Sequence, residues 1–206
     1  MGGACLGVPC LTAHLALFSD GPLEGATVLV QGGAGAVGHY AIQIAKLLGA
    51  APVIATASSP EKEDHARSAG ADAVVNYRSE AVAERVHEIT GGRGVDRVVE
   101  VDIAGNAGIL PKVVARDGLC VAYGSNAPQA AFDFGPMIVS GAAVRFFIVY
   151  ELAPAARAEA IRDLTRWLEE GRLHHAIAAT LPLERTAEAH EIVEQGAAIG
   201  NLIVTP

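Results

Sequence analysis

Residues 26–38, which read ATVLVQGGAGAVG, decide the fold of this chain. Six mostly apolar residues, typical of a buried strand, lead directly into Gly33, Gly35 and Gly38 in Gly-x-Gly-x-x-Gly spacing. Gly33 permits a tight turn, Gly35 lets a pyrophosphate approach the backbone, and Gly38 lets the next helix pack on the strand. Because helix N-termini favour anions, the stretch predicts a dinucleotide-binding loop rather than a plain tight turn.

The rest of the chain alternates short β-branched runs with longer stretches of helical spacing. The predicted strands are residues 26–31, 52–57, 73–76, 97–101, 119–123 and 144–149, and the predicted helices between them are residues 37–48, 60–69, 80–89 and 106–114. A long helix at 154–170, a strand near 176–181, a helix near 184–194 and a strand at 202–205 are expected to follow. This order predicts the α/β class, with a Rossmann-type, doubly wound parallel sheet.

Composition excludes several classes of protein. The chain has 206 residues, of which 51% are hydrophobic and 18% charged, so it can bury a core and is not a disordered segment. Fifteen basic against 23 acidic side chains give a net charge of −8, which argues against nucleic-acid binding. No uninterrupted apolar run reaches the roughly 18–20 residues of a membrane span, so no membrane contact is expected.

Cysteine and histidine usage indicates neither a disulfide framework nor a metal site. The three cysteines, Cys5, Cys10 and Cys120, are odd in number and lack Cys-x-x-Cys spacing. We therefore expect buried thiols, a reducing cytoplasmic location and no bound metal. The seven histidines are scattered, and no catalytic residue can be assigned from the sequence.

The end of the second predicted strand indicates which dinucleotide binds. A site for NAD usually presents an acidic residue there, to bind the adenine ribose. This chain has Ser58 and Ser59 instead, with no acid until Glu61, and Lys62 follows. Hydroxyls and an ammonium group would bind a 2′-phosphate, so NADPH is favoured over NADH. The alternative is that Ser58 only caps a helix and Lys62 is a solvated charge.

Four segments carry a resemblance to a known family: residues 7–17, 27–50, 74–102 and 189–204. On these the chain resembles zinc-independent medium-chain reductases of the NADPH:quinone oxidoreductase, or zeta-crystallin-like, type. The resemblance implies a lead-in helix segment at residues 1–20, a Rossmann domain at 21–172 and a return segment at 173–206. The family's N-terminal GroES-like catalytic domain, on which the return segment would pack, is expected to be absent.

The resemblance also implies cofactor contacts, which follow the cofactor from one end to the other. The pyrophosphate would lie on Gly35, Ala36, Val37 and Gly38, the 2′-phosphate on Ser58, Lys62 and Tyr77 with Ser59 beside them, and the nicotinamide on Tyr123, Gly124, Ser125 and Phe147. Asp102 follows the fourth strand, where it either lines the cleft or forms a turn before Gly105.

The implied activity is direct hydride transfer from NADPH to a small quinone or activated alkene, which needs no metal and no dedicated nucleophile. Two alternatives remain open: an enoyl-reductase module of a larger synthase, and an NADPH-binding protein without catalysis. The last strand of the sheet, residues 144–149, is expected at an edge, and the resemblance implies a homodimer joined through it.

Overall fold

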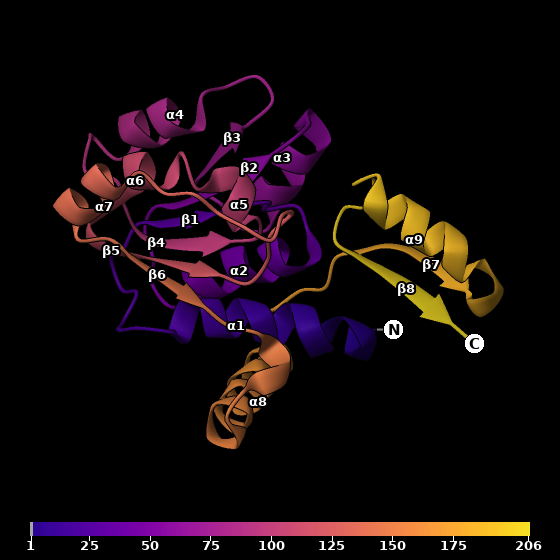
Figure 1. Cartoon of the computed structure of the whole chain (residues 1–206). Helices are drawn as coiled ribbons and strands as arrows, with labels where there is room; N and C mark the ends of the chain where they lie inside the picture. The colour runs from indigo at the N-terminus through magenta and orange to yellow at the C-terminus, as the bar shows by residue number, and fades with distance from the viewer. Residues whose placement is uncertain (1) are drawn as a thin grey trace.

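The computed structural model describes residues 2–206. Six strands form the main sheet in the order β3-β2-β1-β4-β5-β6, and every pairing is parallel (Figure 1). The strands are β1 Val28–Val30, β2 Val53–Ala57, β3 Ala73–Asn76, β4 Val95–Glu100, β5 Val114–Ala122 and β6 Ala143–Phe146. This order confirms the predicted Rossmann-type sheet. The chain adds β2 and β3 on one side of β1 and then adds β4, β5 and β6 on its other side. Such sheets open a crevice at the point between β1 and β4, at the carboxyl ends of the strands.

Helices cover both faces of the sheet. Successive residues of each strand point to opposite sides, and the apolar residues on both sides are buried. In β1, Val28 and Val30 belong to one buried cluster and Leu29 to the other. The first cluster includes residues of α1 (Leu11–Phe18), α2 (Ala36–Leu47), α3 (Pro60–Ser68) and α8 (Pro154–Glu169). The second includes residues of α4 (Val82–Ile89), α5 (Ile103–Asn106) and α6 (Leu110–Val113). Two-sided burial explains why the strands are apolar without alternation.

The lead-in segment before the sheet is helical. Two short turns, Gly2–Cys5 and Leu6–Cys10, run into α1. Arg97, on β4, is 4% exposed, and its guanidinium donates hydrogen bonds to the carbonyl oxygens of Ala16 (3.1 Å) and Leu17 (2.9 Å). Because these carbonyls belong to the last turn of α1, a buried cation fixes that helix against the sheet.

Four details differ from the sequence prediction. The expected helix at 106–114 is two short helices, α5 and α6, and Pro111 lies in the first turn of the second. Strand β5 begins at Val114, because a register shift against β4 absorbs the turn at Asp117, whose φ is 59°. An unpredicted helix, α7 (Phe134–Ser140), precedes β6, and β6 ends at Phe146 rather than at residue 149.

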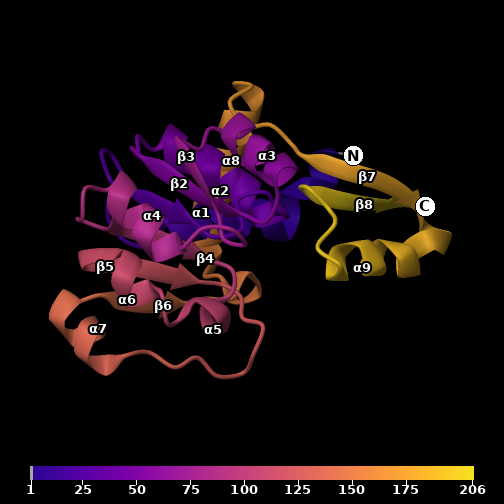
Figure 2. The same ribbon diagram turned by 90° about the horizontal axis from the view of Figure 1, so that it is seen from above.

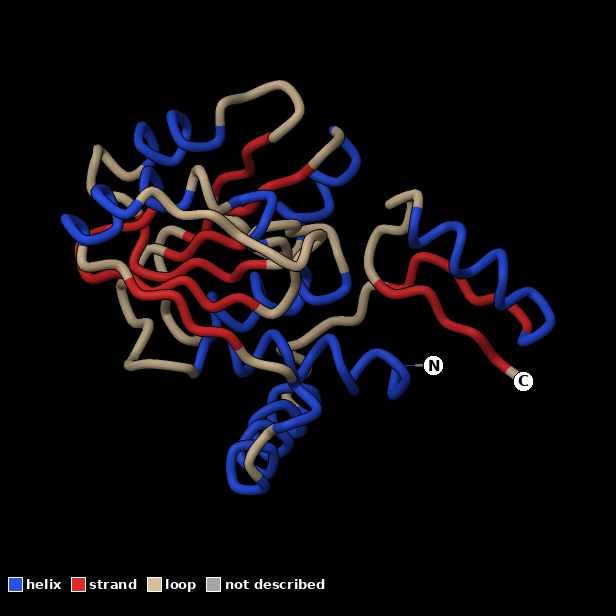
Figure 3. Tube along the Cα trace, viewed as in Figure 1, coloured by secondary structure: helices blue, strands red, loops and turns tan. Residues whose placement is uncertain are grey.

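The last 30 residues form a small unit of their own. Strands β7 (Ile177–Pro182) and β8 (Asn201–Thr205) pair in parallel, and α9 (Thr186–Glu194) connects them. Figures 1 and 2 show this unit beside the carboxyl ends of the main strands, and Figure 3 shows the loop that joins it to α8. An isolated parallel bridge joins Gly200 to Gly35 of the glycine loop. No helix within residues 2–206 is long and apolar enough to cross a membrane.

Candidate cofactor site

A cavity of about 580 Å³ opens between the carboxyl edge of the main sheet and the C-terminal unit. The glycine loop and the ends of β2 form one wall, and residues 193–202 contribute to the other. Among the described residues that line it, Lys62 alone carries a charge. The chain as a whole has a net charge of −8, so this cavity is an exception on an acidic protein.

Two glycines of the loop serve different purposes: Gly38 is needed for close packing, and Gly35 keeps the cavity wall free of a side chain. A Cβ on Gly38 would lie 2.2 Å from the carbonyl oxygen of Gly32, so no larger residue fits there. A Cβ on Gly35 would meet only that same oxygen, at 3.3 Å, and Gly35 lines the cavity. Helix α2 begins at the next residue, so its first-turn N–H groups lie at the cavity wall. This geometry matches a cradle for an anion.

Thr56, which sequence reasoning missed, holds the start of the loop. Its hydroxyl accepts a hydrogen bond from the Gly32 N–H (3.0 Å) and donates one to Oε1 of Gln31 (2.8 Å). Its carbonyl oxygen accepts a hydrogen bond from the Gly33 N–H (2.9 Å). The only sequence signal for this role is a polar residue inside an otherwise apolar buried strand.

The corner expected to hold the 2′-phosphate is assembled as predicted in part. Ser58, Lys62 and Tyr77 line the cavity together, whereas Ser59 does not. Ser59 is the N-cap of α3, where its hydroxyl accepts a hydrogen bond from the Lys62 N–H (3.4 Å). The alternative that Ser58 caps this helix is therefore wrong. The Lys62 ammonium donates a hydrogen bond to the carbonyl oxygen of Gly196 (2.6 Å), in a contact that is open to solvent.

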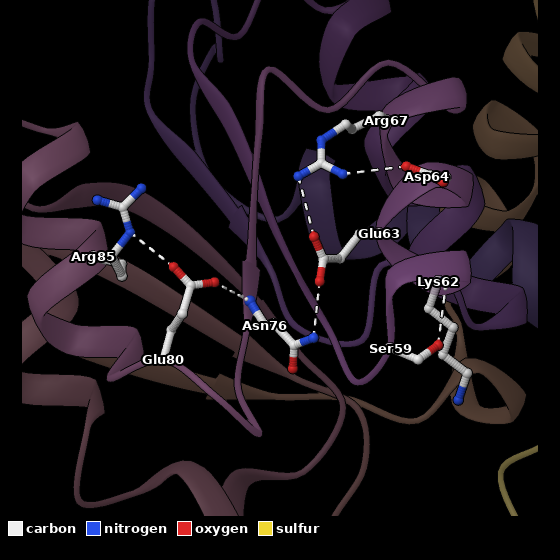
Figure 4. Close-up of polar contacts among 8 residues, drawn as sticks. All are labelled: Ser59, Lys62, Glu63, Asp64, Arg67, Asn76, Glu80 and Arg85. Atoms are coloured by element: carbon white, nitrogen blue, oxygen red, sulfur yellow. Dashed lines mark hydrogen bonds and ion pairs between the residues drawn. The ribbon is translucent and has the colours of Figure 1, made fainter.

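A polar network fixes the elements around this corner (Figure 4). Asn76, at the end of β3, donates from Nδ2 to Glu63 (2.8 Å) and from its backbone N–H to Glu80 (2.8 Å). Arg67 binds Glu63 (3.2 Å), and Arg85 binds Glu80 (3.0 Å). These contacts fasten α3 to the turn after β3. They also pair each of the two carboxylates, Glu63 on α3 and Glu80 after β3, with an arginine.

The residues expected at the nicotinamide end lie around an adjoining cavity of about 430 Å³. Tyr123, Gly124, Ser125 and Phe147 all line it, and Tyr123 also lines the first cavity. The rings of Tyr123 and Phe147 lie 6.5 Å apart, centroid to centroid. Burial raises the pKa of the Tyr123 phenol, so that group stays protonated at neutral pH. Of the predicted residues, Gly33 and Ser59 line neither cavity.

Asp102 forms the expected turn, and it does not line the cofactor cavity. Its Oδ1 accepts hydrogen bonds from the N–H groups of Gly105 (3.2 Å) and Asn126 (2.8 Å), which closes the turn. The residue also lines a third cavity of about 460 Å³. Its neighbour Glu100 is 1% exposed and accepts hydrogen bonds from Asn106 (2.8 Å) and from the Asp102 N–H (2.6 Å). Burial raises the pKa of the Glu100 carboxyl.

Cysteine and histidine side chains do not assemble a metal centre. Within residues 2–206, no group of three or more His, Cys, Asp or Glu could hold a metal ion. Cys5, Cys10 and Cys120 are buried and free, as predicted, and burial raises the pKa of the Cys10 thiol to about 12. Burial raises the pKa of the Cys120 thiol as well, so the Cys10 and Cys120 thiols are protonated at neutral pH.

Comparison with known proteins agrees with this geometry. The model of the family described as zinc-binding dehydrogenase matches residues 36–170. A quinone oxidoreductase of Sus scrofa is 28% identical over 206 residues, covering 98% of this chain and 61% of that protein. A 2-haloacrylate reductase of a Burkholderia species is 33% identical over 187 residues, covering 87% of this chain and 55% of that protein.

A solved structure of Escherichia coli quinone oxidoreductase, complexed with NADPH, superposes with a TM-score of 0.89 at 28% identity. The match covers 98% of this chain and 64% of that one. The chain thus spans less than two thirds of the length of each of these relatives.

Proposed function

Because the chain belongs to the zinc-binding dehydrogenase family, we propose that it is the cofactor-binding portion of an oxidoreductase that binds NADPH and reduces a quinone or an activated alkene. One observation carries the proposal: a glycine-loop cavity with a single charged lining residue, Lys62, at the corner where an adenosine 2′-phosphate would lie. The names of the similar quinone oxidoreductase and 2-haloacrylate reductase support the reaction class.

The residues of the cavity fit the proposed cofactor. Gly35 has no side chain to obstruct a pyrophosphate, and the N–H groups of Ala36 and Val37 lie at the start of α2. Ser58 and Lys62 offer a hydroxyl and an ammonium group to the 2′-phosphate, and no carboxylate lines this cavity within the described part of the chain. When bound, NADPH supplies a hydride. The protein's task is then to bind it, orient it and exclude water.

The family's description also names zinc, and residues 2–206 offer no set of ligands for it. The described side chains therefore do not fit that ion.

Substrate binding is proposed to need parts of the protein outside this chain. The return segment, residues 173–206, exposes Ile177, Leu183 and Val193, which are 40%, 58% and 58% exposed. We propose that these apolar side chains pack on a catalytic domain, while residues 21–172 form the Rossmann domain. The relatives' greater length supports this division.

We also propose that two copies join through β6. This strand is at the edge of the sheet, so its outer backbone groups are available to a partner strand. Phe146 is 64% exposed and Ile148 56% exposed, and α7, which precedes β6, has no buried residue. Sedimentation velocity at micromolar concentration should give a dimer, and a clean monomer would count against the proposal.

A cytoplasmic location is proposed as well. Three free, buried thiols support it, because they are compatible with a reducing compartment.

Steady-state oxidation of NADPH with a small quinone tests the proposed reaction. Joined to a catalytic domain of the kind proposed above, this chain should turn over, and NADPH binding without turnover would favour the alternative of a non-catalytic NADPH-binding protein. Activity that is limited to an acyl-carrier-bound enoyl substrate would favour an enoyl-reductase module.

A further inference from the structure

The segment between α9 and β8, residues 195–200, lines the cavity through Gly196, Ala198 and Gly200, and we call it the strap. At one end of the strap, the carbonyl oxygen of Gly196 accepts the hydrogen bond from Lys62 (2.6 Å). At the other end, the Gly200 N–H donates to the carbonyl oxygen of Ala34 (2.9 Å), and Gly200 forms a bridge with Gly35. The strap therefore touches both the phosphate corner and the glycine loop.

Backbone geometry fixes where the strap presents its groups. Gly196 has a φ of 64° and Gly200 a φ of 85°, conformations that other residues adopt only with strain. A Cβ on Gly200 would lie 2.5 Å from the Cβ of Ala176. The carbonyl that meets Lys62 is thus set by the fold of the C-terminal unit and does not depend on a flexible side chain.

Lys62 is the link between this segment and the ligand corner. An ammonium group has three N–H donors, and among the described residues the structure gives it one acceptor, Gly196. A 2′-phosphate at the Ser58 corner would accept from the remaining donors, in a charge-assisted hydrogen bond. Lys62 would then bind the phosphate and the strap at once.

We propose that the strap is part of the cofactor site and that the 2′-phosphate, through Lys62, stabilises its docked position. This inference rests on the proposed function, since it presupposes NADPH in the cavity. NADPH tightens the strap on the glycine loop, whereas NADH, which lacks the 2′-phosphate, leaves the Lys62 link unchanged. By reciprocity, the docked strap raises the affinity for NADPH and not for NADH.

Residue-resolved hydrogen exchange measured by NMR on the whole chain tests this. The Gly200 amide reports docking, because its acceptor is Ala34 in the glycine loop. The Asn201 amide is the internal control, because its acceptor is Ala176 in the same C-terminal unit (2.8 Å). Saturating NADPH should slow exchange of the Gly200 amide about fivefold or more beyond saturating NADH, with no such difference at Asn201.

Two variants separate the contribution of Lys62 from general effects. In Lys62→Met, which keeps the length of the side chain without its charge, the difference between the cofactors should vanish. In Lys46→Met it should persist, because Lys46 pairs with Asp72 (2.9 Å) and does not line the cavity. The wild-type comparison of the two cofactors stands even if a variant fails to fold.

Each outcome decides between the two proposals. If titration calorimetry shows that NADPH binds but both cofactors slow Gly200 equally, or slow Gly200 and Asn201 alike, the strap inference is overturned and the proposed function stands. If NADPH does not bind the wild-type chain, both are overturned.

Discussion

The two walls of the cavity are built differently. The glycine-loop wall grows out of β1 and β2, whose residues are all buried between two layers of helices. The opposite wall belongs to a two-stranded unit in which β7 has one buried residue, Leu181. Moving a wall that is continuous with the core requires global unfolding of the chain. A wall held by a few contacts opens at a much lower cost in free energy. The fixed wall therefore suits recognition, and the other suits closure.

The loop between α8 and β7 connects the two walls, and its residues His174 and His175 contact α2, the helix that starts at the glycine loop. We call this contact the joint. His39 binds the carbonyl oxygen of His174 through Nε2 (2.8 Å), and Gln43 accepts a hydrogen bond from the His174 N–H (2.8 Å). The Tyr40 hydroxyl lies 2.7 Å from Nδ1 of His175. The loop that leads to the second wall is thus anchored on the helix that supports the first.

Gly38→Ala should have the largest effect, because the added methyl group collides with backbone of the fixed wall. We expect a loss of about 3 kcal/mol in the free energy of unfolding, measured with urea, together with loss of NADPH binding. Gly35→Ala is the matched control, since its methyl group would meet only the carbonyl oxygen of Gly32, at 3.3 Å, on the side of the cavity: stability should fall much less than in Gly38→Ala, and NADPH affinity should be reduced. Equal stability of the two variants would contradict this account of the loop.

Acid should loosen the joint. Burial lowers the pKa of His39 to about 4 from 6.5, so the unfolded chain binds this proton first as the pH falls. The stability that neutral His39 contributes is complete above about pH 6.5 and is lost between there and pH 4, by about 3 kcal/mol. Urea titrations from pH 8 to pH 4 measure it.

His65, which lies 4.9 Å from His39 ring to ring, and His175 also have lowered pKa values and add to the loss in the same direction. The His39→Gln variant isolates the contribution of His39. If its stability falls with acid as steeply as that of the wild type, His39 is not the group responsible.

Lys62→Ala tests the contact between the walls and the phosphate corner together. NADPH affinity should fall by about 1–3 kcal/mol, as expected for a charge-assisted hydrogen bond, while NADH affinity stays nearly constant. Titration calorimetry measures both, with Lys46→Ala as the control. Equal losses for the two cofactors would overturn the assignment of Lys62 to the 2′-phosphate.

Thr56→Val should have the smallest of these effects and should act on the fixed wall alone. The variant leaves the Gly32 N–H and the side-chain Oε1 of Gln31 without their shared partner, which costs about 1–2 kcal/mol. Thr56→Ser keeps the hydroxyl and should restore most of the stability in urea unfolding. Equal midpoints for the two variants would mean that the hydroxyl does not hold the loop.

The same contrast explains what could be predicted from the sequence. Residues 26–38 determine a strand, a loop and a helix by local chemistry, so the glycine loop followed from their pattern, and the parallel sheet followed from the alternation of strands and helices along the chain. The contact of Lys62 with Gly196 joins residues 134 positions apart and uses a backbone carbonyl, which leaves no trace in residue types. Between Ser58 and Ser59 the sequence was ambiguous, because either hydroxyl can cap a helix and only the backbone decides.

Helix α7 was missed for a related reason. Phe134, Ile138 and Val139 are 77%, 63% and 73% exposed, so its apolar residues do not mark a buried face of the chain. Periodicity reports burial, and an exposed apolar helix carries no such signal.

The central claim is that this cavity selects a dinucleotide by its 2′-phosphate. Isothermal titration of the unmodified chain with NADPH and with NADH, in the same buffer and at the same salt concentration, tests it most directly. The account predicts that NADPH binds at least about tenfold more tightly, the equivalent of roughly 1.4 kcal/mol. Equal affinities, or tighter binding of NADH, would contradict it.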